Sequence, residues 1–371
     1  MLARFLAIFA AMLAVAPCAG AGFGPDPLFL TGEAFDSMHA SAVTANLPGV
    51  SFMLRTIDGR TQFQCGERIQ VQFVISSRLK NKYHCDPGEG RRDGWNKDVL
   101  VCDAVTRAVD PLTSNYLEDN SLLVGDRLDQ FPNYVNSPRI DTMDLNEWIA
   151  FDKPGTYRVY AITRRVYALG PKGLPSQDIE KNGGPPTAST VLTLTITPTE
   201  NAWEQRVITQ ALAPYHGPWD DVMEQRAALL RYLRTKDAAV TLLHEMESNY
   251  TYKYPQDKGW YEGECAECLL ESPYRVDMIP LMEQEIADPD FPVTESFLGT
   301  YCVLLIYKAA PTKADDNASS HPSLEDISHH ATSLLQQALP AKRGSAREVS
   351  SQTAKTFNFG INDIIAMEQG G

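Results

Sequence analysis

The spacing of hydrophobic residues changes once along this chain of 371 residues. Before Pro198, apolar and polar residues alternate in short runs, and a period of two is typical of strands that bury one face. The runs that predict strands are 50–55, 67–77, 98–105, 155–168 and 190–197. Turn-forming residues separate them, and the stretches 22–49, 106–145 and 169–188 are predicted to be irregular.

After Pro198, apolar residues recur at the i, i+4 spacing of helices. Helices are predicted at 199–213, 220–235, 237–247, 265–271, 275–286, 294–309, 323–339 and 346–367. A loop is expected at 249–263 and a linker at 311–321. Short turns between helices favour antiparallel helix pairs, stacked as in a HEAT-like array.

One turn says more about the fold than any other stretch. Asp152, Pro154 and Gly155 form a turn that delivers Tyr157 to the start of a strand. In immunoglobulin-like sandwiches a tyrosine placed in this way bonds back to the backbone just upstream. We therefore predict a multidomain β-then-α fold, an immunoglobulin-like β-sandwich followed by an α-helical HEAT-like array. Asp152, Gly155 and Tyr157 are its predicted tyrosine corner.

The first residues have the pattern of an export signal. Arg4 precedes an apolar stretch, and Ala19-Gly20-Ala21 is a small-residue cleavage site. We predict a signal peptide at 1–21, a sandwich domain at 22–198 and a helical domain at 199–371. A lipid-modified Cys18 is the less favoured alternative, because Pro17 stands where a small residue is needed. No segment of the mature chain is expected to span a membrane.

The net charge of −14 is concentrated in the helical half. Residues 199–371 contain 14 Lys and Arg against 26 Asp and Glu, a net charge of −12. Nucleic-acid binding requires a basic surface that displaces counterions, so this partner class is excluded.

Six cysteines follow the predicted signal peptide, and an even number in an exported chain suggests disulfides. The disulfide candidates are Cys65, Cys85, Cys102, Cys265, Cys268 and Cys302. Cys85 and Cys102 flank a loop, so we expect a bridge that closes a hairpin. Cys302 is expected to meet Cys265 or Cys268.

The Cys265-Ala-Glu-Cys268 motif has two alternative interpretations besides a structural disulfide. Two thiols at i, i+3 share a helix face and could form a redox pair. A zinc site would need further ligands, for which His244 and Cys302 are the best available. We favour the structural disulfide and predict no metal and no cofactor.

Four aromatic residues crowd the predicted loop, namely Tyr250, Tyr254, Trp260 and Tyr261. They are either binding anchors, since Trp and Tyr dominate interfaces, or a cover for a helical groove. The neighbouring histidines His329 and His330 point in different directions on a helix and are interpreted as surface residues.

Several short motifs resemble a known group of proteins. They are Asp110-Pro-Leu, Asp144-Leu-Asn-Glu-Trp148, Phe151-Asp-x-Pro-Gly-x-Tyr157, Ser272-Pro-Tyr-Arg275 and Asp288-Pro-Asp-Phe-Pro-Val293. Together they are similar to uncharacterised exported bacterial proteins, best represented among acidobacteria, in which an immunoglobulin-like region precedes a HEAT-like helical region. The resemblance implies the fold and export from a bacterial cell, and it supplies no catalytic residue.

The predicted function is that of a secreted or periplasmic protein-binding or scaffold protein with a protein partner in the cell envelope. No catalytic residue is assigned. The alternative is a cell-envelope enzyme, a hydrolase or a thiol oxidoreductase, with its site at the domain junction or at Cys265 and Cys268.

Overall fold

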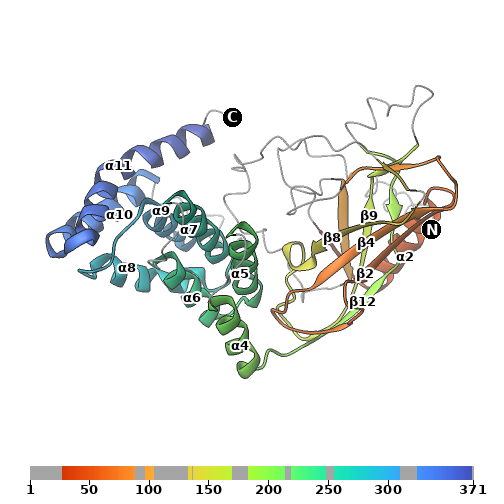
Figure 1. Ribbon diagram of the computed structural model, residues 1–371, viewed down its shortest axis with the longest axis horizontal. Coiled ribbons are helices and arrows are strands. Elements are labelled where there is room, and N and C mark those ends of the chain that lie inside the picture. The colour runs from red at the N-terminus through yellow and green to blue at the C-terminus, as the bar shows by residue number, and fades with distance from the viewer. Residues whose placement is uncertain are drawn as a thin grey trace. The chain divides into compact units, whose positions relative to one another are not determined.

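The chain folds into two compact units, Met1–Glu200 (the β unit) and Asn201–Gly371 (the helical unit). The computed structural model describes residues 27–87, 97–103, 133–135, 137–168, 183–213, 219–247, 255–309 and 324–369. The boundary lies two residues after Pro198, where the sequence changes period. The predicted order, sheet first and helices second, is confirmed (Figure 1). The predicted signal peptide at 1–21 lies outside the described residues.

The β unit holds most of its strands in two sheets. Its strands are β1 (Leu28–Leu30), β2 (Val50–Thr56), β3 (Gln62–Gln64), β4 (Gln70–Ser77), β5 (His84–Cys85), β6 (Asp98–Asp103), β7 (Asn133–Tyr134), β8 (Arg139–Asp144), β9 (Gly155–Thr163), β10 (Val166–Tyr167), β11 (Thr187–Ala188) and β12 (Leu192–Thr197). The larger sheet has the order β1-β6-β9-β12-β3, with β11 beside β9. The second sheet has the order β2-β4-β8, and a small third sheet has the order β10-β5-β7.

Most strand pairs are antiparallel, with two exceptions at the edges of the larger sheet. There β1 runs parallel to β6, and β3 runs parallel to β12. The inner faces of the larger sheet and the β2-β4-β8 sheet contribute to one hydrophobic core. The predicted inward faces of β4 and β12 are confirmed, since Val71, Phe73, Ile75, Leu194 and Ile196 are all buried. These alternating apolar residues are what drive the two sheets together.

The outer face of the larger sheet carries a helix that the sequence did not predict. Residues 22–49 were expected to be irregular, but they contain β1 and the helix α2 (Gly32–Thr44). Phe35 of α2 packs against Val101 and Tyr160 on β6 and β9. Only Phe35 and Ala42 of α2 are buried, so its sequence shows little of the periodicity that identifies a helix.

Strand β8 lies within the stretch 106–145, which was also expected to be irregular. Its alternation is inverted, because Ile140 is exposed and Asp141 is buried. A charged residue on the inner face hides a strand from pattern analysis. A short 3₁₀ turn, η2 (Leu145–Glu147), follows β8 and leads to the turn before β9.

The helical unit consists of α4 (Asn201–Leu212), α5 (Trp219–Leu233), α6 (Lys236–Glu247), α7 (Pro255–Leu270), η3 (Arg275–Met278), α8 (Ile279–Ala287), α9 (Glu295–Ala309), α10 (Leu324–Ala338), η4 (Leu339–Ala341) and α11 (Gly344–Gln369) (Figure 1). Helices that follow one another pack together from α4 to α7 and from α8 to α11, and α7 also packs against α5 and α9. The predicted loop 249–263 is wrong from Pro255 onward, because α7 begins there. Within the described ranges, no helix is both long and apolar enough to cross a membrane.

Candidate functional site

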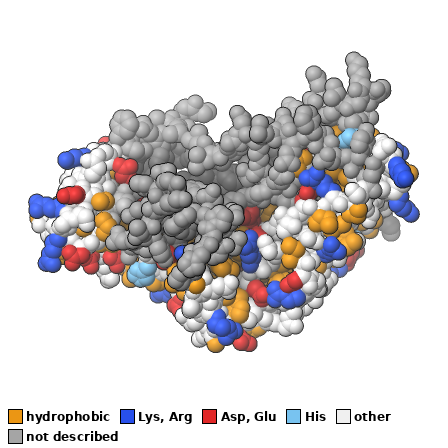
Figure 2. Space-filling view, in the orientation of Figure 1, with side chains coloured by type: hydrophobic (Ala, Val, Ile, Leu, Met, Phe, Trp, Pro, Cys, Tyr) orange, Lys and Arg blue, Asp and Glu red, His pale blue; other side chains and the backbone are white. Residues whose placement is uncertain are grey.

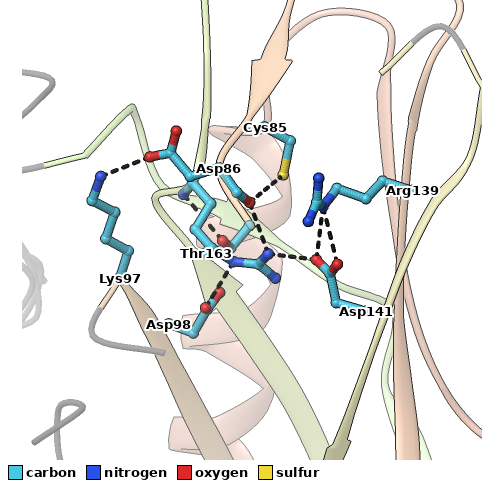
Figure 3. Close-up of polar contacts among 8 residues, drawn as sticks. Cys85, Asp86, Lys97, Asp98, Arg139, Asp141 and Thr163 are labelled. Carbon is cyan, nitrogen blue, oxygen red and sulfur yellow. Dashed lines mark hydrogen bonds and ion pairs between the residues drawn. The ribbon is translucent and has the colours of Figure 1, made fainter. Parts of the chain in front are cut away.

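The densest group of buried charges surrounds Arg165, which lies between β9 and β10. Arg165 and Asp98, the first residue of β6, are each only 1% exposed. Arg165 Nε lies 2.8 Å from Asp98 Oδ2. Arg165 Nη1 donates to Asp141 Oδ2 of β8 at 2.6 Å (Figure 3). One guanidinium therefore ties β6 in the larger sheet to β8 in the second sheet.

Three further charged residues complete this group. Arg139 Nε donates to both carboxylate oxygens of Asp141, at 3.0 and 3.1 Å. The carbonyl of Asp86 accepts from Arg165 Nη1 at 3.0 Å, and its carboxylate accepts from Lys97 Nζ at 2.7 Å. We call Asp86, Lys97, Asp98, Arg139, Asp141 and Arg165 the Arg165 cluster. It holds three cations and three carboxylates, so its charges cancel (Figure 3).

Burial dominates the electrostatics of the Arg165 cluster. It raises the pKa of Asp98, against the opposing attraction of Arg165. It acts to lower the pKa of Arg165, but Asp98, Cys85 and Asp141 outweigh it, so the net direction is upward. Burial also raises the pKa of the adjacent Cys85 thiol to about 12. Cys85 is therefore a protonated thiol at neutral pH, and a thiol in that form is a poor nucleophile.

The Arg165 cluster is built to hold strands together rather than to bind a ligand. Its central ion pairs are almost fully buried, and each charged member contacts another member or the backbone of one. Removing one partner of such a pair leaves an uncompensated buried charge, so the members depend on one another. The sequence analysis did not find this group. The one indication in the sequence was Asp98, a charged residue at the start of the apolar run 98–105, where a buried charge needs a partner.

The predicted tyrosine corner has a well-defined geometry. Tyr157 is fully buried in β9, and its hydroxyl donates to the carbonyl of Lys153 at 2.6 Å. The ring of Phe151 meets the ring of Tyr157 edge to face, with centroids 4.9 Å apart. Gly155 is the first residue of β9, and Asp152 lies exposed in the turn. The corner thus fixes how the chain enters β9.

The predicted disulfides are not present, since none of the six cysteines is bridged. Cys85 is on β5 and Cys102 is on β6, and these strands belong to different sheets. β5 pairs with β10 and β7, and β6 pairs with β1 and β9, so β5 and β6 are not the two strands of a hairpin. The expected Cys85–Cys102 disulfide would therefore not join two neighbouring strands. Cys65, which follows β3, is half-buried, and burial raises the pKa of its thiol.

The cysteines of the helical unit are also not bridged. Cys265 and Cys268 lie buried on α7, and Cys302 lies buried on α9. The Cys268 thiol donates to the carbonyl of Ala227 at 3.7 Å. Burial raises the pKa of Cys302 to about 12. His244, proposed as a zinc ligand, is exposed at the end of α6, and no cluster of three or more His, Cys, Asp or Glu suited to a metal occurs among the residues described.

The predicted aromatic anchors fall largely outside what the structure describes. Tyr250 and Tyr254 lie outside the described residues. Trp260 and Tyr261 lie on α7 rather than in a loop. His330 is exposed on α10, and its Nε2 lies 3.4 Å from the hydroxyl of Tyr301.

Two of the motifs that carry the resemblance have structural roles in the helical unit. In Ser272-Pro-Tyr-Arg275, Arg275 Nη1 donates to the carbonyl of Leu270 at 3.0 Å, at the end of α7. In the motif that ends at Val293, Lys342 Nζ donates to the carbonyls of Asp288 and Phe291, at 2.5 and 2.7 Å. These contacts give hydrogen-bond donors to carbonyls at the end of α7 and in the turn after α8, where helical partners run out. The motifs mark chain turns, not chemistry.

The β2-β4-β8 sheet exposes apolar side chains on its outer face. Its strand register places Met53 beside Val74, and Val74 beside Ile140, in one row across three strands. Met53 is 40% exposed and Ile140 is 50% exposed. Figure 2 shows hydrophobic side chains among charged ones over this sheet. We call Met53, Val74 and Ile140 the apolar row.

Comparison with protein-family models, with curated proteins and with solved structures found no match.

Proposed function

We propose that this protein is a secreted or periplasmic protein-binding or scaffold protein, composed of an immunoglobulin-like β-sandwich and a HEAT-like helical array. The observation that carries the proposal is a contrast within the β unit. The buried charges of the Arg165 cluster are engaged with one another, whereas apolar side chains are exposed on a sheet face. Exposed apolar rows on a rigid sheet suit protein contacts.

The strand order supports the immunoglobulin-like part of the proposal. In that fold, strands A, B and E share one sheet, and strands C, F and G share the other. Here β2, β4 and β8 have the positions of A, B and E, and β6, β9 and β12 those of C, F and G. Tyr157 near the start of β9 has the position of the tyrosine corner on strand F.

The packing of the helical unit supports an array of helix pairs. Consecutive helices contact one another from α4 to α7 and from α8 to α11. Such arrays contact mainly their neighbours and present an extended surface to partners. The export signal predicted at 1–21 supports a location outside the cytoplasm.

Binding through the apolar row is testable with a matched pair of variants. Met53→Lys places a charge in the row, and Val43→Lys makes the same change at a similarly exposed residue of α2. Each full-length variant is used to capture proteins from a cell-envelope extract. We expect a partner that wild type and Val43→Lys both retain and that Met53→Lys loses. Equal capture by all three would exclude the row as the binding face.

The alternative of a thiol oxidoreductase at Cys265 and Cys268 is disfavoured by their environment. Such enzymes need an accessible thiolate. Cys265 is fully buried and Cys268 is 2% exposed. A Cys265→Ser, Cys268→Ser variant should therefore be less stable than wild type, while the two proteins should not differ in disulfide reductase activity. A measured thiol-exchange activity that disappears in this variant would favour the enzyme.

A further inference from the structure

The outer edge of β8 has backbone groups available for another strand. β8 ends the order β2-β4-β8. The carbonyl of Phe52 on β2 accepts from Thr190 N at 3.1 Å, so Phe52 directs its backbone away from β4. In an antiparallel sheet, successive residues of a strand direct their N–H and C=O groups to opposite sides. Two residues paired across a ladder direct these groups either toward each other or away from each other, so the register relates Phe52 to the residues of β8. It follows that Ile140 and Thr142 direct their N–H and C=O groups away from β4, toward the edge.

The side chains around this edge agree with that geometry. Ile140 is half exposed and Thr142 is exposed, both on the outer face. Among the strands that the structure describes, only β4 pairs with β8. Within the described part of the chain, the edge is therefore open to a further strand along its central residues.

Two features limit which strand the edge can accept. Asp141 is an inward-pointing charge on the edge strand, and Pro138 lies just before it. Inward charges and prolines are the devices by which sheet edges avoid indiscriminate pairing. Asp141 already accepts from Arg139 and Arg165 of its own chain, so an incoming strand must not place a second carboxylate opposite it. The same strand must place an apolar residue opposite Ile140.

A second copy of β8 meets both requirements in one register. When two antiparallel β8 strands are centred on Ile140, each Ile140 faces its counterpart. Each Arg139 then lies opposite the partner's Asp141, so opposite charges meet on the inner face. We infer that β8 pairs with β8 of a second copy of this chain, which joins two three-stranded sheets into one and doubles the apolar row.

The expected dimer is weak and depends on concentration. One short strand supplies few backbone hydrogen bonds, and contacts of this size lie at the lower end of specific interfaces. Pro138 lies opposite Thr142 of the partner and offers no N–H, which keeps the ladder short.

Cysteine cross-linking tests the register directly. In the inferred pairing, the two Ile140 residues form a hydrogen-bonded pair with Cα atoms about 5.5 Å apart, within the range that a disulfide bridges. Two Thr142 residues are separated by four residue steps, about 13 Å. Under mild oxidation of the full-length protein, Ile140→Cys should form a disulfide-linked dimer, whereas its exposed neighbour Thr142→Cys should not. Equal cross-linking of both, or of Thr142→Cys alone, would refute the register.

A second measurement does not depend on cross-linking. Sedimentation velocity over a concentration series should show wild type shifting from monomer toward dimer. Thr142→Pro removes an N–H that faces outward, a change that edge strands tolerate, and it should remain monomeric. A wild type that is monomeric throughout the series, and an Ile140→Cys that does not cross-link, would overturn the inference. The inference goes beyond the proposed function and fails separately from it, because no captured partner is involved.

Discussion

Arg165→Met offers the sharpest test of how the β unit is held together. The substitution keeps an apolar stem but removes the guanidinium, which leaves the carboxylates of Asp98 and Asp141 buried. Breaking a buried ion pair on one side costs about 3–5 kcal/mol. Since domains of this kind are stable by about 5–15 kcal/mol, we expect a β unit that folds at pH 8 but is much less stable.

The loss should be smaller in acid. Burial raises the pKa of Asp98, and the attraction of Arg165, which opposes that rise, is gone in the variant. Between the unfolded pKa of about 3.9 and the raised folded pKa, the folded state binds more protons. The free energy of unfolding then falls as the pH rises through this window. Arg165→Met should accordingly lose less stability at pH 5 than at pH 8.

Hydrogen exchange read by mass spectrometry can follow the β unit within the full chain. Peptides from β9 and β12 report its global opening in a urea series at each pH. Arg164→Met is the matched control, because this half-buried neighbour carries the same charge outside the Arg165 cluster. A loss below about 1 kcal/mol, the size of an ordinary substitution, would refute the reasoning. So would equal losses at both pH values or in both variants.

Five further predictions follow from single residues. Tyr157→Phe removes the hydroxyl that binds the Lys153 carbonyl and should cost about 1–2 kcal/mol in urea unfolding. Gly184→Ala would place its Cβ 2.1 Å from the carbonyl oxygen of Val166 and should be strongly destabilising. Gly299→Ala meets no atom within 4 Å in the helix α9 and should gain up to about 1 kcal/mol in the same assay. Burial lowers the pKa of Lys342, so between this lowered pKa and the unfolded value of about 10.4 the folded state binds fewer protons and stability rises with pH. Lys342→Met should lack this rise in a pH series of the same assay. In native protein, maleimide should label half-buried Cys65 before the five buried cysteines, as mass spectrometry of digests would show.

The sequence predicted those parts of the fold in which polarity and burial agree. The strands at 70–77 and 192–197 alternate as a half-buried sheet requires, and most helices of the second unit were placed within a few residues. The predictions failed where burial opposes polarity. β8 turns Asp141 inward and Ile140 outward, so a pattern search finds no strand there.

The Arg165 cluster could not be predicted for a related reason. Its members come from β6, β8 and the segments around β5 and β10, which are far apart in the chain. Only the pairing of the sheets brings Asp98, Asp141 and Arg165 together. The disulfide prediction failed on the same grounds, because cysteine counts do not show which strands are neighbours. Cys85 and Cys102 are near in sequence but belong to different sheets.

The outer face of the β2-β4-β8 sheet exposes Met53 and Ile140, whereas the helix α2 covers the outer face of the larger sheet. It seals Phe35 against Val101 and Tyr160, and in the described part of the protein the Tyr160 hydroxyl is buried there without a hydrogen-bond partner. Such a group favours local opening, because lifting the helix lets water reach it. While α2 is in place it covers this face, so an antibody raised against the intact protein should not recognise it. In a fragment that starts after α2, Val101 and Tyr160 would be exposed, and an antibody raised against that fragment should bind this apolar face.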